Sequence, residues 1–112
     1  MSWRVEFYRT PNGRAPVEDY LDELSSSEAA KAVRALELLR TYGIELGMPH
    51  VRHLRGGLYE FRLRGQREHR VLYVALTGQR FLLLHAFTKK TQQTPPNEIA
   101  LAEQRYHEYL NR

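Results

Sequence analysis

Hydrophobic and polar positions alternate at the start of the chain with the period of a β-strand. In "WRVEFY" (3–8) Trp3, Val5 and Phe7 fall on one side of such a strand and the polar residues on the other. From 16 to 24, and again from 29 to 42, apolar positions recur at helical spacing instead. The serine cluster 25–27 separates these stretches and can cap the second, and Gly43 can end it. The pattern predicts one strand followed by a pair of antiparallel helices.

Three closely spaced strands are expected in the second half of the chain, in "LYEFRLRG" (58–65), "REHRVLYVAL" (67–76) and "RFLLLHAF" (80–87). Their short connections, around Gly65 and Gly78, require antiparallel hairpins. Segment 44–57 shows neither period and holds three glycines and a proline, so we expect a loop there. Thr94 as N-cap and Pro95 as first helical residue predict a final helix that ends near Leu110.

The resulting order is β-α-α-β-β-β-α, which predicts a single α+β domain over 1–112. We expect a small, mostly antiparallel sheet packed by the two N-terminal helices and the C-terminal helix. Helices on one face would leave the other face partly open, and the alternating Arg62 and Arg64 would mark that open face. A hydrophobic content of 42% is sufficient for a core without metal or disulfide support.

Composition points to a cytoplasmic protein. The chain has no cysteine, as expected in a reducing compartment. The charged N-terminus does not resemble a signal peptide. The longest unbroken apolar run, 71–76, is far shorter than the ~20 residues of a membrane span. We therefore expect no membrane association.

The charges are segregated along the chain, whose formal net charge is +4. Between 52 and 90 there are nine basic residues and only two acidic ones, Glu60 and Glu68. Between 17 and 45 there are seven acidic residues and three basic ones. Arginine dominates, since only three of the 17 basic residues are lysines. This distribution predicts one side that faces a polyanion.

Arg62 and Arg70 are candidates for a phosphate clamp. Arg62 lies opposite the apolar positions of its strand, and Arg70 begins the next strand across a hairpin. The alternative is cross-strand pairing with Glu60 and Glu68. Two acids cannot neutralise the five arginines of 53–70, which favours phosphate binding. The other arginines that we expect to contact RNA are Arg52, Arg55, Arg64 and Arg67.

Lys89 and Lys90 stand just past the last expected strand, and Thr91 can add a hydroxyl there. The nearest acids along the chain are Glu68 and Glu98, so the sequence itself provides no neighbouring partner. The lysines are either part of the same anion site or a guard against edge-to-edge strand pairing.

Among the histidines, His53 is the best general acid or base, because it lies in the expected glycine-rich loop between arginines. His50 is the second choice. His85 shares the apolar face of Phe81, Leu83 and Phe87 on an expected strand, which is typical of a core histidine with satisfied hydrogen bonds. His69 and His107 are expected at the surface. No metal-ligand spacing and no cofactor motif is present, so neither a metal nor a cofactor is expected.

Three segments together resemble the phage-derived HigB-type toxins of the RelE/ParE superfamily: "HLRGGLYEFRLRG", "HRVLYVAL" and "LLHAFTKKTQQTPPNEIALAEQRYHEYL". The similarity covers nearly the whole chain, and "FTKKTQQTP" followed by a helix that ends in "YL" is its most specific part. The resemblance implies a RelE-like fold. It also implies a type II toxin that cleaves messenger RNA on the ribosome without a metal and is held in check by a helix-turn-helix, HigA-like antitoxin.

Carried over by motif, the catalytic positions are Arg62 of "EFR", Arg70 of "HRVLY", and Lys89 and Lys90. The chain has Ala86 where relatives often have glycine. It also lacks the tyrosine or histidine that other branches place after the last strand. Proton transfer therefore falls to His53 or to a lysine, or catalysis rests on positioning and charge. Two other functions stay open: inhibition of DNA gyrase in the manner of ParE, and an inactive module that only binds antitoxin or RNA.

Overall fold

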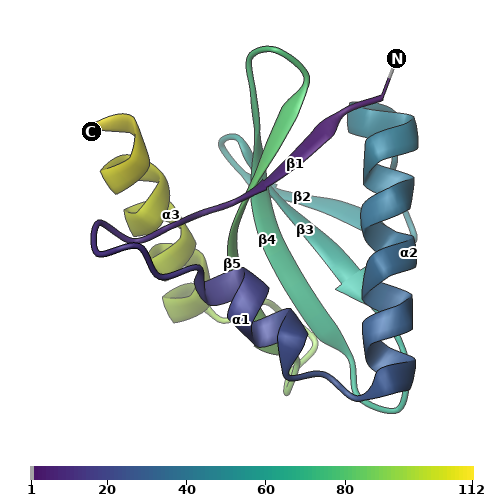
Figure 1. The fold of residues 1–112 in the computed structure, drawn as a ribbon. Coiled ribbons are helices and arrows are strands. Elements are labelled where there is room, and N and C mark those ends of the chain that lie inside the picture. Colours follow the sequence, from purple (N-terminus) through teal and green to yellow (C-terminus); the bar gives the residue numbers. More distant parts are fainter. Residues whose placement is uncertain (1) are drawn as a thin grey trace.

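The computed structural model describes residues 2–112 and contains five strands and three helices (Figure 1). In chain order the elements are β1 (Arg4–Phe7), α1 (Pro16–Asp22), α2 (Ser26–Tyr42), a 3-10 turn (Gly43–Glu45), β2 (Val51–Arg55), β3 (Leu58–Leu63), β4 (His69–Leu76), β5 (Arg80–Thr88) and α3 (Pro96–Leu110). The α+β class is confirmed. No helix within residues 2–112 combines the length and the apolar character that crossing a membrane requires.

The sheet is mixed, with strand order β1-β5-β4-β3-β2. Among the strands of the described residues, only β1 and β5 run parallel, and the hairpins predicted between β3, β4 and β5 are confirmed. The loop predicted over 44–57 is wrong in its second half, because Val51–Arg55 forms the edge strand β2. Val51 is buried, but Arg52 and His53 are both exposed. An edge strand that is largely exposed has no hydrophobic period to reveal it.

Helices cover both faces of the sheet, which corrects the expectation of one covered face. In Figure 1, α2 and α3 lie on opposite sides of the strands. The core under α1 and α2 includes Val17, Leu39, Phe61, Tyr73 and Phe81. The core under α3 includes Leu58, Leu72, Val74, Leu84 and Ala102. Strand β4 is apolar on both sides, so each of its faces must be covered.

A bulge in β5 changes which residues share a face. The pairing of β5 with β4 gains one residue at Leu84. Phe81 and Leu83 therefore pack under α2, whereas Phe87 packs on the α3 side. His85 also bonds to α3. The expectation that His85 shares a face with Phe81 and Leu83 is wrong, because a bulge inverts the alternation beyond it.

The predicted ends of α2 are confirmed. Ser25 and Glu28 form a reciprocal capping box, and Gly43 ends the helix. The start of α3 differs by one residue: the N-cap is Pro95, and no side chain caps it. Thr94 is not the cap, because its hydroxyl is used by a buried carboxylate of the sheet.

Gly43→Ala is expected to destabilise the fold by about 2–5 kcal/mol. Gly43 has φ of +59°, and an added Cβ would overlap the indole of Trp3. That indole stacks on Phe81 with ring centroids 4.5 Å apart, so displacing it disturbs the core. Urea denaturation followed by circular dichroism measures the change. Gly47→Ala is the control, since its Cβ would meet nothing within 4 Å. Equal stability of the two variants would contradict the assigned role of Gly43.

Candidate functional site

The candidate site lies where β3 ends, β4 begins and β5 ends. Antiparallel pairing brings these three points to one end of the sheet. Arg62 of β3 lies directly opposite Arg70 of β4, and Arg70 lies opposite Phe87 of β5. Lys89 follows β5 immediately, and its backbone N–H donates to the carbonyl of Glu68 at 2.8 Å. The predicted proximity of Arg62 and Arg70 is confirmed.

Arg70 is buried, with 2% of its surface exposed. Its Nη1 donates to both carboxylate oxygens of Glu60, at 3.2 and 3.3 Å, and its Nε donates to Glu68 at 3.0 Å. Glu60 itself is fully buried. The alternative of cross-strand pairing therefore holds for Arg70. A guanidinium enclosed by two carboxylates holds the site together and is not free to clamp a phosphate.

Thr94 joins this buried pair to the segment that precedes α3. Its hydroxyl donates to Glu60 and accepts from Nη1 of Arg70 at 3.3 Å. The buried charges of the pair thus have hydrogen-bond partners on three different segments, as a buried ion pair requires. No local pattern in the sequence indicates this role for Thr94, which depends on contact between residues 34 positions apart.

Lys89 has an acidic partner in the folded chain, although none neighbours it in the sequence. Its Nζ lies 3.6 Å from Oε2 of Glu68. Partial burial raises the pKa of Glu68, but the hydrogen bond from Arg70 and the charge of Lys89 outweigh burial, so the pKa lies below its usual value. The expectation of an unneutralised lysine pair is therefore wrong for Lys89. It stays open for Lys90, which makes no ion pair within residues 2–112.

Arg62 is only partly satisfied. Its side chain is 11% exposed, and Nε lies 3.7 Å from Glu60, beyond hydrogen-bond distance. This buried Nε has no hydrogen-bond partner among residues 2–112. Glu60 is already bound by Arg70 and Thr94, which leaves Arg62 without an acceptor of its own. A buried donor without an acceptor is unfavourable unless a ligand or a water molecule supplies one.

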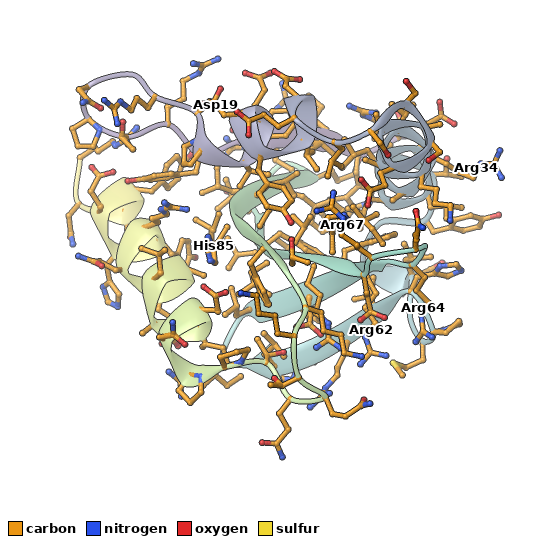
Figure 2. The ribbon with its side chains drawn as sticks, turned by 90° about the horizontal axis from the view of Figure 1, so that it is seen from below. Asp19, Arg34, Arg62, Arg64, Arg67 and His85 are labelled. Atoms are coloured by element: carbon orange, nitrogen blue, oxygen red, sulfur yellow. The ribbon has the colours of Figure 1, made fainter. Side chains whose placement is uncertain are left out.

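Together these residues form a cluster, called here the basic cluster, with five cations and two carboxylates, or a net charge of 5 − 2 = +3. Arg64 belongs to it because it directly follows the end of β3, two residues after Arg62, and its charge helps to lower the pKa of Glu68. Figure 2 shows Arg62 and Arg64 at the same end of the sheet. The members are Arg62, Arg64, Arg70, Lys89 and Lys90 with Glu60 and Glu68.

A comparison with known protein families identifies the family to which the chain belongs. Residues 19–107 match the family described as phage-derived protein Gp49-like (DUF891). The chain belongs to this family. Gp49-like proteins are a toxin-like family, of RelE/HigB type, in toxin–antitoxin systems. A search of curated proteins gave no match.

Several candidate residues of this Gp49-like chain lie away from the basic cluster. His53 pairs in register with Tyr59, and the centroids of their rings lie 5.1 Å apart. Tyr59 packs against the core on the α2 side of the sheet. Its Nε2 lies 2.6 Å from the carbonyl oxygen of Gly56. Since Arg62 lies on the α3 side, the structure does not bring His53 and Arg62 together.

The predicted RNA-binding residues fall into two groups. Arg55 forms a bidentate ion pair with Glu103 of α3, and Arg67 forms one with Glu28 of α2. Arg52 and Arg64 are exposed, and Thr91 is exposed with its hydroxyl donating to the carbonyl of Gln93 at 2.7 Å. Arg55 and Arg67 are exposed too, so what separates the groups is pairing: only Arg52, Arg64 and Thr91 can reach a ligand without giving up an ion pair.

His69 is buried, contrary to the expectation that it lies at the surface. Its Nδ1 lies 2.6 Å from the hydroxyl of Tyr20, and its Nε2 lies 2.7 Å from Glu28. The same Glu28 accepts from Arg67. These four residues join α1, α2 and β4, and they stabilise the helical pair on the side away from the basic cluster.

Acid is expected to weaken the Gp49-like fold through Glu28. The hydrogen bond from Arg67, and then that from His69, lower the pKa of Glu28 to about 2. An unfolded glutamate titrates near 4.5, so this stabilisation is complete above pH 4.5 and is lost as the pH falls towards 2. Urea denaturation between pH 7 and pH 2 measures it. Glu28→Gln should flatten that part of the profile, and an unchanged profile would contradict the assignment.

His85 has the satisfied hydrogen bonds that were predicted for it. Its Nε2 lies 2.9 Å from Glu98, and Nη1 of Arg105 donates to its Nδ1 at 3.3 Å. Burial lowers the pKa of His85, and the opposing effect of Glu98 is smaller. The lowered pKa favours the neutral ring at pH 7. With both nitrogens engaged, His85 fixes α3 on the sheet beside Phe87.

Proposed function

We propose that this chain is the toxin of a type II toxin–antitoxin system and an endoribonuclease that cleaves messenger RNA on the ribosome. The observation that carries the proposal is the excess of cations in the basic cluster, above all the buried Arg62 Nε without an acceptor. RNA phosphate is the acceptor that such a cluster suits, because arginine binds phosphate oxygens through charge-assisted hydrogen bonds.

The reaction proposed is attack of the ribose 2′-oxygen on the adjacent phosphate, with loss of the 2′-hydroxyl proton to water. The 5′-oxygen of the next nucleotide departs with a proton taken from water, which leaves a 2′,3′-cyclic phosphate and a 5′-hydroxyl end. Negative charge builds up on the phosphate oxygens as the new bond forms. Arg62 and Lys90 would stabilise that charge, while Arg70 and Glu60 hold the end of the sheet rigid behind them. Lys89 would approach the same phosphate from its position beside Glu68.

We propose no histidine as the general acid or base of this reaction. His53 lies on the other side of the sheet, and both nitrogens of His85 are engaged. We therefore assign the rate acceleration to charge and to positioning, with the ribosome holding the message in a reactive geometry. The proposed reaction therefore depends on the ribosome, since a few cations alone do not orient a flexible strand.

The expected protein partner is a helix-turn-helix, HigA-like antitoxin that covers the basic cluster or prevents entry to the ribosome. Its surface would be acidic where it meets Arg62, Arg64 and Lys90, because complementary charge speeds association and favours the correct partner.

Induction of the wild-type chain in cells, followed by mapping of new messenger RNA 5′ ends, tests the proposal. We expect breaks inside translated reading frames, which vanish from a reporter whose start codon is removed. The variant Arg64→Ala/Lys90→Ala removes two exposed cluster cations and should reduce the breaks at least tenfold. Arg14→Ala/Arg40→Ala removes equal charge elsewhere and should leave them unchanged.

The other outcomes separate the alternatives. Growth arrest with intact messages would replace the nuclease with an inhibitor of another target, such as DNA gyrase. Absence of both arrest and breaks would leave a module that binds antitoxin or RNA without chemistry.

A further inference from the structure

A basic groove runs beside the candidate site, between α2 and the end of β3. It has a volume of about 240 Å³ and is open to solvent. The residues that matter for its chemistry are Lys31, Arg34, His50, Phe61, Arg62 and Arg64. Figure 2 shows Arg34 on α2 and Arg62 and Arg64 at the neighbouring end of the sheet. None of the proposed catalytic steps uses Lys31, Arg34 or His50.

The rim of this groove is cationic, and no carboxylate of residues 2–112 lines it. Lys31 donates through Nζ to the backbone carbonyl of Arg64 at 2.9 Å, which positions its charge at the rim and leaves two N–H groups free. Arg34 and Arg64 are exposed and make no ion pair within residues 2–112. Lys31, Arg34 and Arg64 thus place three positive charges at the rim that have no acidic partner within residues 2–112, and they select a polyanionic occupant.

The floor of the groove is apolar and carries an aromatic pair. The imidazole of His50 stacks on Phe61 with ring centroids 6.3 Å apart and an interplanar angle of 28°. His50 is exposed, so one face of its ring is available to a ligand. A flat ring beside a cationic rim is the arrangement with which proteins bind single-stranded nucleic acid, since bases stack and phosphates meet cations.

We infer that this groove binds single-stranded RNA beside the scissile phosphate, with one base stacked on His50 and its phosphates held by Lys31, Arg34 and Arg64. The inference rests on the proposed function and adds a second nucleotide site on α2. Arg62 borders both the groove and the basic cluster, so one continuous strand can occupy the two. An acidic peptide would satisfy the rim but would leave the stacking surface unused, and RNA is therefore the better match.

The test measures binding, not cleavage. The probe is a fluorescein-labelled oligoribonucleotide of ten residues in which 2′-O-methyl groups prevent 2′-hydroxyl attack. Anisotropy titrations at several salt concentrations give an affinity and a salt slope. Lys31→Gln/Arg34→Gln should reduce the slope of log K against log salt by about 1.4, since a single-stranded phosphate contact contributes about 0.7. Arg14→Gln/Arg40→Gln, with the same change in charge, should leave the slope unchanged.

His50→Ala provides an independent readout. It should weaken binding about fivefold or more, as expected when a base loses its stacking partner, with no change in salt slope. Wild-type affinity and slope in both groove variants would overturn the inference. The inference would also be overturned if a decaglutamate peptide bound the groove and the affinity for RNA were unchanged in these variants. That result would favour an acidic protein partner.

The two proposals can fail separately. Because the probe cannot be cleaved, wild-type affinity and salt slope in the groove variants count against the RNA site even when messenger RNA is cut in cells. Conversely, intact messages in cells together with groove-dependent binding of the probe would retain the RNA site and remove the nuclease.

Discussion

Arg70→Ala is expected to lower the free energy of unfolding by about 3–5 kcal/mol. Removing the guanidinium leaves the carboxylate of Glu60, fully buried, without the cation that neutralises it. Glu68 loses a hydrogen-bond donor at the same time, and Thr94 loses the Arg70 Nη1 that donates to it. Urea denaturation of the purified variant, followed by circular dichroism, measures the effect.

Two controls separate burial from charge. Arg64→Ala removes an exposed arginine that lies two residues from Arg62 and should change stability by no more than about 0.5 kcal/mol. Glu60→Gln/Arg70→Met removes both buried charges and should recover much of the loss, since no uncompensated ion remains. Equal stability of Arg70→Ala and Arg64→Ala would show that the buried pair has no structural role.

This expectation changes how growth assays on Arg70 are interpreted. A variant that does not fold is not toxic, whatever the function of the replaced side chain. Loss of toxicity in Arg70→Ala therefore supports catalysis only when the variant is shown to be folded. Arg62 and Lys90 are better positions for testing chemistry, because neither is enclosed by two carboxylates.

Arg62→Gln is expected to reduce the rate of messenger RNA cleavage by about 100- to 1000-fold, the usual effect of removing one donor aimed at developing negative charge. Its stability should stay within about 1 kcal/mol of wild type, since the Nε that it loses has no hydrogen-bond partner among the described residues. Single-turnover cleavage on ribosomes programmed with a short message gives the rate. The loss should appear in kcat more than in KM, because the contact strengthens in the transition state.

Arg14→Gln provides the control for net charge, as it removes one exposed arginine far along the chain. We expect its cleavage rate to equal that of wild type. A folded Arg62→Gln variant that cleaves at the wild-type rate would exclude Arg62 from the reaction and would leave Lys90 as the main candidate.

The sequence by itself determined the local features of this protein. The ends of α2, the two C-terminal hairpins and the opposition of Arg62 and Arg70 all depend on residues within a few positions of one another. Periodicity, capping and turn length act over that range, and so they can be recognised without coordinates. The segregation of basic and acidic residues along the chain also comes from the sequence alone, and it predicts one side that faces a polyanion.

Only the tertiary structure decided which charges are free. Glu60 and Glu68 neutralise Arg70, and the hydroxyl of Thr94, in the loop before α3, accepts a hydrogen bond from it. Glu68 is also the ion-pair partner of Lys89. The bulge at Leu84 and the placement of α3 on the second face likewise depend on packing between distant segments. Pairing energies depend on distance in space and on burial, neither of which is encoded in spacing along the chain. Thus the sequence indicates a basic site, and the fold determines that Arg62, Arg64 and Lys90 are its available cations, with Lys31 and Arg34 beside them.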